Sequence, residues 1–174
     1  MIYQEGNLQF DFSQALTSRR FDQSATHGLS HCMKAVDFIV ELPNRTLFIE
    51  VKDPENPQIP AQYQTQNRLQ FTNRFLSNEL ALQDLVPKFR DSYLYEHAMG
   101  RLAKPVYYFV LIALNTLTAP ELDNQTLYLH RQLPVDGPPH QNWNTKFVHR
   151  CLVFNLTSWN KHLPQFPITR LPSA

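Results

Sequence analysis

Asp37, Glu50 and Lys52 are the residues whose types and spacing could support chemistry. Twelve residues separate Asp37 from Glu50, and Lys52 follows Glu50 after a single valine. Two carboxylates that face one point repel each other unless a proton or a cation lies between them. Magnesium is usually held by one or two carboxylates together with water and substrate phosphate. A lysine beside such a pair could orient an attacking water or offset the charge of a phosphate.

The segment that carries these residues, Lys34 to Asp53, is predicted to form two strands joined by a turn. Val36–Leu42 and Leu47–Val51 are rich in Val, Ile and Phe, which favour strands. The residues between them, Pro43-Asn44-Arg45-Thr46, are typical of turns. We therefore expect a β-hairpin.

The alternation of side chains along a strand decides which groups of the hairpin meet. Pairing Leu42 with Leu47 across the turn places Asp37 opposite Lys52, with Glu50 on the same face. The other face is then wholly apolar and carries Val36, Phe38, Val40, Leu42, Leu47, Ile49 and Val51. A slip of one residue would turn this apolar row to the wrong side, so the register is well specified.

Spacing alone leaves a simpler reading open, in which Asp37 and Lys52 form a cross-strand pair beside an exposed Glu50. However, Val36-Asp37 followed by Glu50-Val51-Lys52 resembles the core motif of the PD-(D/E)xK nuclease superfamily, with Val where the name-giving pattern has Pro. The resemblance implies that Asp37 and Glu50 bind Mg²⁺ or Mn²⁺ and that the backbone carbonyl of Val51 is a further ligand. It also implies that Lys52 assists the nucleophilic water.

The resemblance further implies an acidic residue from a helix that precedes the hairpin. The candidates are Glu5, Asp11 and Asp22. We favour Asp22 as a further metal ligand because it ends a helix predicted over residues 13–22. Alternatively, Asp22 pairs with Arg19 or Arg20.

Several basic residues are candidates for contacts with nucleic-acid phosphates. His31 and Lys34 precede the first strand of the hairpin, near the patch that Asp37, Glu50 and Lys52 form. Lys88 and Arg90 lie on the polar face of a later predicted helix. Ordinary surface charge is the alternative interpretation of all four residues.

The composition is that of a globular protein. The chain has 174 residues, of which 43% are hydrophobic and 18% charged, which suits one domain with a buried core. A net charge of +1 argues against a large nonspecific nucleic-acid surface, but it leaves room for a small basic cleft. The two cysteines form no CxxC pair and indicate reduced thiols. No apolar run approaches the ~18 residues of a membrane span, so we expect a cytoplasmic protein without membrane contact.

Periodicity and turn residues predict the remaining elements. They are a strand over 7–13, a helix over 13–22, a loop over 24–30, a Pro-rich loop over 53–61, a helix over 62–83 broken near Ser77, a helix over 88–102, a buried strand over 106–114, a helix over 118–133, a loop over 134–144, a strand over 147–154, a helix over 155–163 and an irregular tail over 164–174.

This order predicts an α/β fold with a central mixed β-sheet flanked by helices, which is also the restriction-endonuclease-like architecture. We expect a single nuclease-like domain, residues 1–174, that hydrolyses phosphodiester bonds with a divalent metal. The resemblance favours DNA over RNA and suggests a role in DNA repair or in defence, with endonuclease and exonuclease activity both open. The alternative is a catalytically inactive nuclease-like scaffold that binds nucleic acid or a protein partner. A homodimer or a targeting partner also stays open.

Overall fold

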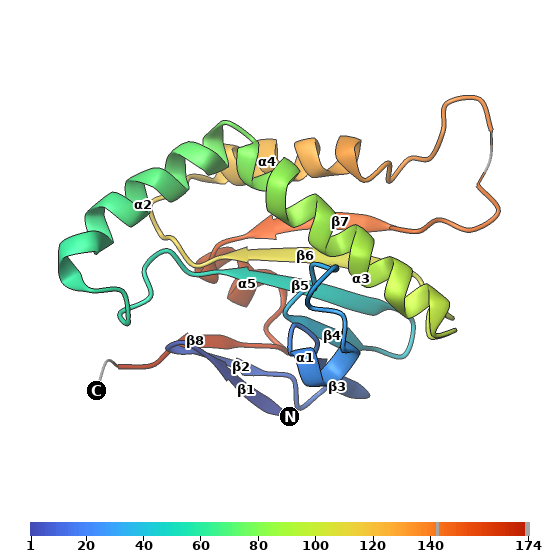
Figure 1. The fold of residues 1–174 in the computed structure, drawn as a ribbon, viewed down its shortest axis with the longest axis horizontal. Coiled ribbons are helices and arrows are strands. Elements are labelled where there is room, and N and C mark those ends of the chain that lie inside the picture. Colours follow the sequence, from blue (N-terminus) through green and yellow to red (C-terminus); the bar gives the residue numbers. More distant parts are fainter. Residues whose placement is uncertain (142, 173–174) are drawn as a thin grey trace.

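The fold is built on a five-stranded mixed β-sheet with helices on both faces (Figure 1). The computed structural model describes residues 1–141 and 143–172. The strands lie in the order β3 (Thr17–Arg20), β4 (Phe38–Glu41), β5 (Thr46–Lys52), β6 (Val106–Ile112) and β7 (Arg150–Phe154). β3, β4 and β5 pair antiparallel, whereas β5, β6 and β7 pair parallel. The predicted α/β class with a central mixed sheet flanked by helices is confirmed.

β5 and β6 lie at the centre of the sheet, and apart from Thr46, Glu50 and Lys52 of β5 their residues are apolar or aromatic on both faces. Parallel strands are usually covered on both sides, and their side chains then form nearly continuous hydrophobic runs. The run predicted over 106–114 forms β6, which ends at Ile112. The one hydroxyl in its buried part, that of Tyr108, donates a hydrogen bond to the Leu85 carbonyl at 2.9 Å.

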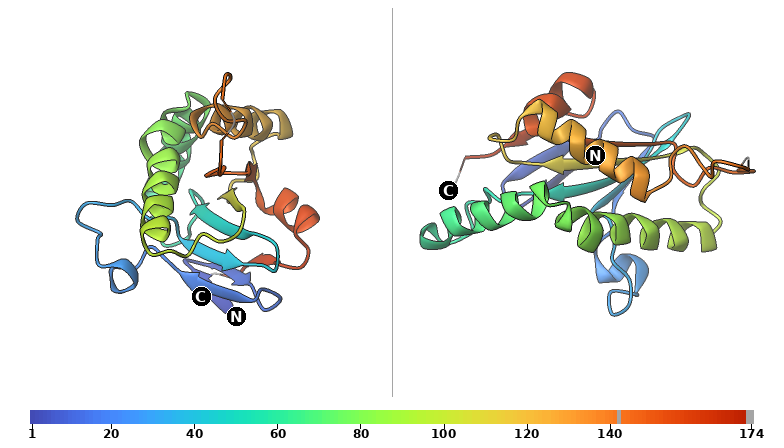
Figure 2. Two further views of the ribbon diagram at one scale, coloured as in Figure 1. Left: turned by 90° about the vertical axis from the view of Figure 1, so that its right-hand side faces the viewer. Right: turned by 90° about the horizontal axis from the view of Figure 1, so that it is seen from above.

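One face of the sheet is covered by three long helices and a short π-helical segment (Figure 2). These elements are α2 (Ala61–Leu76), η1 (Ala81–Leu85), α3 (Val86–Ala98) and α4 (Ala119–Gln132). Phe75, Leu85, Phe89 and Leu129 from this layer pack with Phe48 of β5 in one hydrophobic core. α2 and η1 together correspond to the predicted helix over 62–83, and its expected break near Ser77 is confirmed by Asn78, whose φ is +64°.

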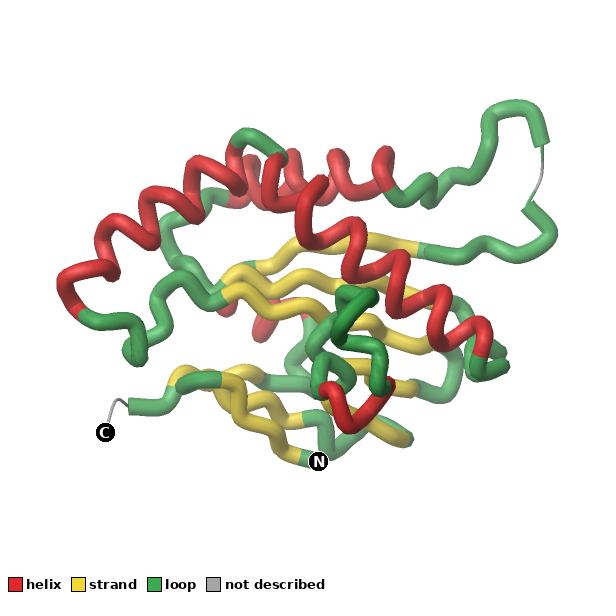
Figure 3. The backbone as a smooth tube through the Cα atoms, viewed as in Figure 1, coloured by secondary structure: helices red, strands yellow, loops and turns green. Residues whose placement is uncertain are grey.

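The opposite face is covered by α5 (Leu156–His162) and by a separate three-stranded sheet (Figure 3). That sheet consists of β1 (Ile2–Glu5), β2 (Leu8–Asp11) and β8 (Ile168–Arg170), in the order β1-β2-β8. Phe10 of β2 and Trp159 of α5 belong to a second core together with Ile49 and Phe109 of the large sheet. The site-bearing strand β5 is therefore packed from both sides.

The predictions for both ends of the chain are wrong in part. The segment predicted as a helix over 13–22 contains β3 instead, because Thr17–Arg20 pairs with Phe38–Glu41 of β4. Such long-range pairing overrides local propensity. The loop expected over 24–30 holds one helical turn, α1 (Ser24–His27), and the tail expected to be irregular contributes β8 to the small sheet. In the middle of the chain, the helix predicted over 88–102 ends at Ala98.

Arg170 of β8 fastens the small sheet to the end of β5. Its guanidinium donates to both carboxylate oxygens of Asp53, at 2.8 and 3.0 Å, and to the Ala113 carbonyl at 3.1 Å. The same guanidinium donates to Asn7 Oδ1 at 2.7 Å. Asp53 directly follows Lys52, so this contact holds the strand end that carries the predicted site.

Within the described residues, no helix is long and apolar enough to cross a membrane.

We expect Arg170→Ala to lower the free energy of unfolding by about 1–3 kcal/mol, because the mostly buried Asp53 carboxylate loses its bidentate partner. Thermal unfolding followed by circular dichroism measures the effect. Lys161→Ala on the exposed side of α5 is the control and should leave the melting temperature nearly unchanged. Equal melting temperatures for Arg170→Ala and wild type would show that the contact contributes little.

Candidate functional site

The hairpin is present, but its register differs by two residues from the expected one. Phe38 pairs with Ile49 and Val40 with Leu47. The reason is a tighter turn: the Leu42 N–H donates to the Arg45 carbonyl at 2.9 Å, so Pro43 and Asn44 alone form the connection. Continued outward, this register sets Asp37 opposite Glu50 rather than opposite Lys52.

A shift of two residues preserves the faces of the strands, because side chains alternate with period two. The apolar face is therefore confirmed for six of its seven predicted residues: Phe38, Val40, Leu42, Leu47, Ile49 and Val51. The exception is Val36, which packs in the core on the helical side. It lies before the first residue of β4, where the chain has already left the ladder.

The hairpin opens at Val51, two positions beyond the last pair of β4 and β5. Facing residues in a hydrogen-bonded antiparallel pair exchange both N–H and C=O groups, and the register would give Val51 the partner Val36. Instead, the Val36 N–H donates to Ser92 Oγ at 3.0 Å, and the Val51 N–H donates to Asp37 Oδ2 at 2.5 Å. The Val51 carbonyl thus faces the Asp37 side of β5 without its ladder partner.

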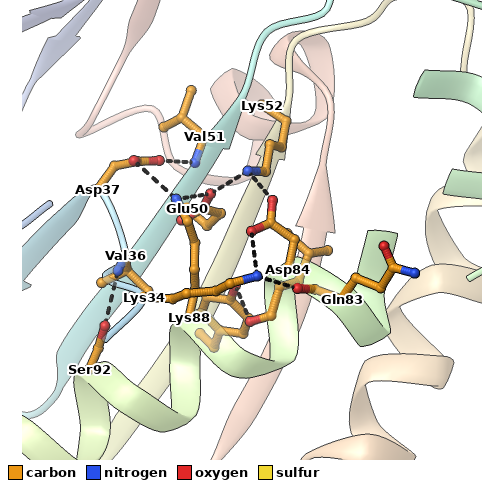
Figure 4. A network of polar contacts seen from close by, with 12 residues as sticks. Lys34, Val36, Asp37, Glu50, Val51, Lys52, Gln83, Asp84, Lys88 and Ser92 are labelled. Carbon is orange, nitrogen blue, oxygen red and sulfur yellow. Dashed lines mark hydrogen bonds and ion pairs between the residues drawn. The ribbon is translucent and has the colours of Figure 1, made fainter. Parts of the chain in front are cut away.

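Three carboxylates and two lysines converge on the helical side of this opening (Figure 4). Lys88 Nζ lies 2.7 Å from Glu50 Oε1 and 3.7 Å from Asp37 Oδ1, so it bridges the two carboxylates. Lys52 Nζ lies 3.0 Å from Glu50 Oε1 and is also paired with Asp84. These five residues, Asp37, Glu50, Lys52, Asp84 and Lys88, are called the carboxylate cluster below.

Burial is the dominant electrostatic feature of the two hairpin carboxylates. The Glu50 side chain is fully buried and that of Asp37 is 10% exposed. Burial raises the pKa of Asp37 well above its ordinary value, and the neighbouring Glu50 raises it further. Burial also raises the pKa of Glu50, although Lys52 and Lys88 oppose this shift. The pair therefore requires a cation to remain ionised in the folded protein.

The other members of the carboxylate cluster are held in their charged forms. Burial lowers the pKa of Lys52, but Glu50 and Asp84 outweigh it, and the net pKa is raised. The pKa of Lys88 is likewise raised, since Glu50 and Asp37 outweigh its burial. Burial raises the pKa of Asp84, but its hydrogen bond from Lys52 lowers the net value. Both lysines are thus ammonium ions and Asp84 is a carboxylate at neutral pH.

The hairpin end of the carboxylate cluster carries the oxygen ligand types that a small hard cation prefers, although Lys88 Nζ lies between the two carboxylates. Glu50 Oε2 is buried and has no hydrogen-bond partner among the described residues, which is a costly state for a carboxylate oxygen. Within residues 1–141 and 143–172, no group of three or more His, Cys, Asp and Glu is arranged to hold a metal ion. Two carboxylates with one backbone carbonyl instead match the sparse protein ligand set of Mg²⁺, which keeps several waters.

The predicted accessory residues lie at different distances from the cluster. Asp22 is exposed, and its charge contributes to the raised pKa of Asp37, so it lies near the opening but not within the network. It forms no ion pair with Arg19 or Arg20, which pair with Glu96 and Glu5. The other two candidates for the further acid, Glu5 and Asp11, are engaged with Arg20 and with Ser13, respectively.

The four residues predicted to contact phosphate also lie at different places relative to the cluster. Lys34 is exposed at the margin of the cluster, with Nζ 2.6 Å from the Gln83 carbonyl and 4.0 Å from Asp84 Oδ1. His31 is exposed and precedes it in the chain. Lys88 lies inside the cluster rather than on an outer surface. Arg90 points toward α4, where it donates to the Gln132 carbonyl at 2.9 Å.

The sequence reasoning missed two residues, Asp84 and Ser92. A signal for Asp84 was present, since it stands four residues before Lys88 in a run whose other inward positions, Ala81, Leu85 and Phe89, are apolar. In a helix, that spacing brings two side chains to one face. No linear signal marks Ser92, a buried hydroxyl whose role depends on where the hairpin ends.

The carboxylate cluster is covered by its own lysine side chains. A cavity of about 570 Å³ lies beside β7, lined by residues such as Arg45, Phe109 and Leu152. At the cluster, the Lys52 and Lys88 side chains cover the carboxylates and are themselves only 20% and 18% exposed. Access to Asp37 and Glu50 therefore requires displacement of at least Lys88.

Comparisons with protein-family models, with curated proteins and with solved structures returned no match for this chain.

We expect Asp37→Asn to stabilise the protein at neutral pH. Because the pKa of Asp37 is raised in the folded state, wild type loses stability as pH rises from about 4, the ordinary value, through the raised pKa. The variant removes this loss, so its melting temperature should exceed that of wild type by a few degrees at pH 7.5. The difference should shrink toward pH 4.

Thermal unfolding of both proteins across this pH range measures the difference. Asp123→Asn, at an exposed carboxylate of α4, is the matched control and should show no trend. A less stable Asp37→Asn protein at pH 7.5 would contradict the inferred electrostatics.

Proposed function

We propose that the chain is a divalent-metal-dependent nuclease, with DNA favoured over RNA as the substrate. The observation that carries this proposal is the buried, orphaned Oε2 of Glu50 beside Asp37 and the unpaired strand edge at Val51, with Lys52 on the same side. The mixed sheet flanked by helices supports the restriction-endonuclease-like fold that the hairpin motif implies.

Asp37, Glu50 and the Val51 carbonyl are the groups that would hold Mg²⁺ or Mn²⁺. When bound, the ion would lower the pKa of water and neutralise charge on the scissile phosphate. Such an ion would stabilise the ionised forms of both carboxylates, which burial disfavours. The hydrogen bond from the Val51 N–H keeps Asp37 turned toward the strand end.

Lys52 serves as a charged donor rather than as a proton acceptor. Its raised pKa keeps the ammonium protonated at neutral pH. Glu50 Oε1 and Asp84 fix the position of Nζ from two directions. From there Nζ can donate to the attacking water or to a phosphate oxygen, which places a positive charge where negative charge develops. Asp84 is thus a positioning residue for Lys52.

A second function, a catalytically inactive nuclease-like scaffold, is favoured by one specific observation. Lys88 Nζ lies between the carboxylates of Asp37 and Glu50, where a metal-dependent enzyme needs its cation. A permanent ammonium in that place would stabilise the fold and leave no room for a metal. The two functions therefore differ in whether Lys88 yields to a divalent ion.

We expect the wild-type protein to cleave DNA in the presence of Mg²⁺ or Mn²⁺. Glu50→Gln and Lys52→Met should each lower the cleavage rate by about 100-fold or more, since each removes a charge from the reacting region. Gel assays with supercoiled, linear and single-stranded DNA and with RNA measure the rates and the substrate preference. Lys161→Met, remote from the cluster, is the control.

Two outcomes of this assay would contradict the proposal. Cleavage that survives in Lys52→Met would exclude the stated role of Lys52. A wild-type protein that cleaves none of the substrates with either metal would favour the scaffold.

We expect Lys88→Met to bind Mn²⁺ more tightly than wild type, by about tenfold or more, because the ion no longer competes with an ammonium bonded to two carboxylates. Titration calorimetry and electron paramagnetic resonance of free Mn²⁺ measure binding without any catalytic step. Glu50→Gln should abolish the binding in either background. If neither wild type nor Lys88→Met binds Mn²⁺, the scaffold function is supported instead.

A further inference from the structure

A second site lies at the edge of the large sheet, beside the edge strand β7. The cavity of about 570 Å³ there lies within the ~300–1,000 Å³ typical of sites for small organic ligands. It runs along β7 between α4 and α5, which pack on opposite faces of the sheet (Figure 2). Its apolar lining includes Phe109, Leu122, Leu152, Phe154 and Leu163.

Two arginines that line this cavity are neighbours of Tyr107. The Arg45 guanidinium lies over the Tyr107 ring, with Cζ 5.3 Å from the ring centroid. Arg150 is the direct strand neighbour of Tyr107 in the parallel pairing of β6 and β7. Leu47 pairs with Tyr107 on the other side, so Arg45, two residues before Leu47, shares this face of the sheet. All three residues line the cavity.

Neither guanidinium of the cavity has a hydrogen-bond or ion-pair partner among the described residues. Arg45 Nε is buried and has no acceptor within the described residues, and neither Arg45 nor Arg150 forms an ion pair there. Two hydroxyls of the lining are already engaged, since Thr126 Oγ1 accepts from the Val153 N–H and Ser158 Oγ accepts from the Asn155 N–H. A buried donor without an acceptor is costly, so an oxygen anion at Arg45 would satisfy it.

The charges of the lining favour an anion. Besides Arg45 and Arg150, the lining contains a single acidic residue, the exposed Asp123 of α4, together with His162 of α5. Planar guanidinium groups bind carboxylate and phosphate oxygens in a bidentate manner. The apolar floor then remains for the body of the ligand.

We propose that this cavity binds a small organic anion with a flat apolar body, such as an aromatic carboxylate. The carboxylate accepts hydrogen bonds from Arg45 and Arg150, and the ring system packs on Phe109, Leu152 and Phe154. The site is independent of the carboxylate cluster, because Tyr107, Leu152 and Phe154 lie with the core on the α5 side, whereas Lys88 and Asp84 lie on the α3 side.

The test compares 1-naphthoate with its neutral isostere, 1-naphthamide, by titration of ¹⁵N-labelled protein in two-dimensional NMR. We expect naphthoate to shift the amide signals of Leu152 and Phe154 and to bind about 10- to 100-fold more tightly than naphthamide, the factor that hydrogen bonds to a charged group supply. Arg45→Gln and Arg150→Gln should each reduce this preference. Arg131→Gln, at an exposed arginine of α4 outside the cavity, is the control and should retain it.

Equal affinities of the two compounds for wild type would overturn the proposal, as would the absence of shifts at these amides at millimolar ligand. Retention of the full preference in both Arg45→Gln and Arg150→Gln would overturn it too. If Arg45→Gln fails to fold, the comparison of acid and amide on wild type and on Arg150→Gln still decides the question.

Discussion

The burial of two like-charged carboxylates at the open end of a hairpin is the constraint on which the structure of the site depends. Asp37 and Glu50 cannot both stay ionised away from water without a positive partner. Lys88 of α3 and Lys52 of β5 supply part of this positive charge, although the pKa of Asp37 stays raised. Burial of these charges raises the free energy of the folded state, and such an electrostatic cost is characteristic of functional sites.

The surrounding fold maintains the open end of the hairpin at which Asp37 and Glu50 are buried. Ser92 Oγ of α3 accepts a hydrogen bond from the Val36 N–H, so the chain leaves the β4–β5 ladder one residue before Asp37. Arg170 of the small sheet holds Asp53, directly after Lys52. The two cores on either face of β5 fix the strand between them. Elements from both ends of the chain and from α3 thus position a few atoms of the hairpin.

The faces of the hairpin, the central strand β6, and helices α4 and α5 could be predicted because each depends on local periodicity and caps. Asn155, for instance, accepts from the Ser158 N–H at 2.8 Å at the start of α5, as its sequence position suggests. The exact register could not be predicted, since it depends on a two-residue turn at Pro43-Asn44 rather than on the apolar pattern. A register shift of two residues leaves the apolar pattern unchanged.

The remaining differences arise from long-range contacts. Thr17–Arg20 has no strong strand pattern and becomes β3 because β4 offers a free edge. Ile168–Arg170 becomes β8 because β2 lies beside it. The chemistry of the site shows the same division: Asp37, Glu50 and Lys52 lie on one local hairpin, whereas Asp84 and Lys88 join them only when α3 packs on the sheet.

The position of a divalent ion relative to Lys88 is the most direct measure of whether the carboxylate cluster is a metal-dependent site. Crystals grown with Mn²⁺ and measured at a wavelength with strong anomalous scattering would locate the ion. The account predicts an anomalous peak bound by Asp37, Glu50 Oε2 and the Val51 carbonyl, with Lys88 Nζ displaced from between the carboxylates. An absent peak, with Lys88 Nζ still bridging Asp37 and Glu50 at millimolar Mn²⁺, would contradict it.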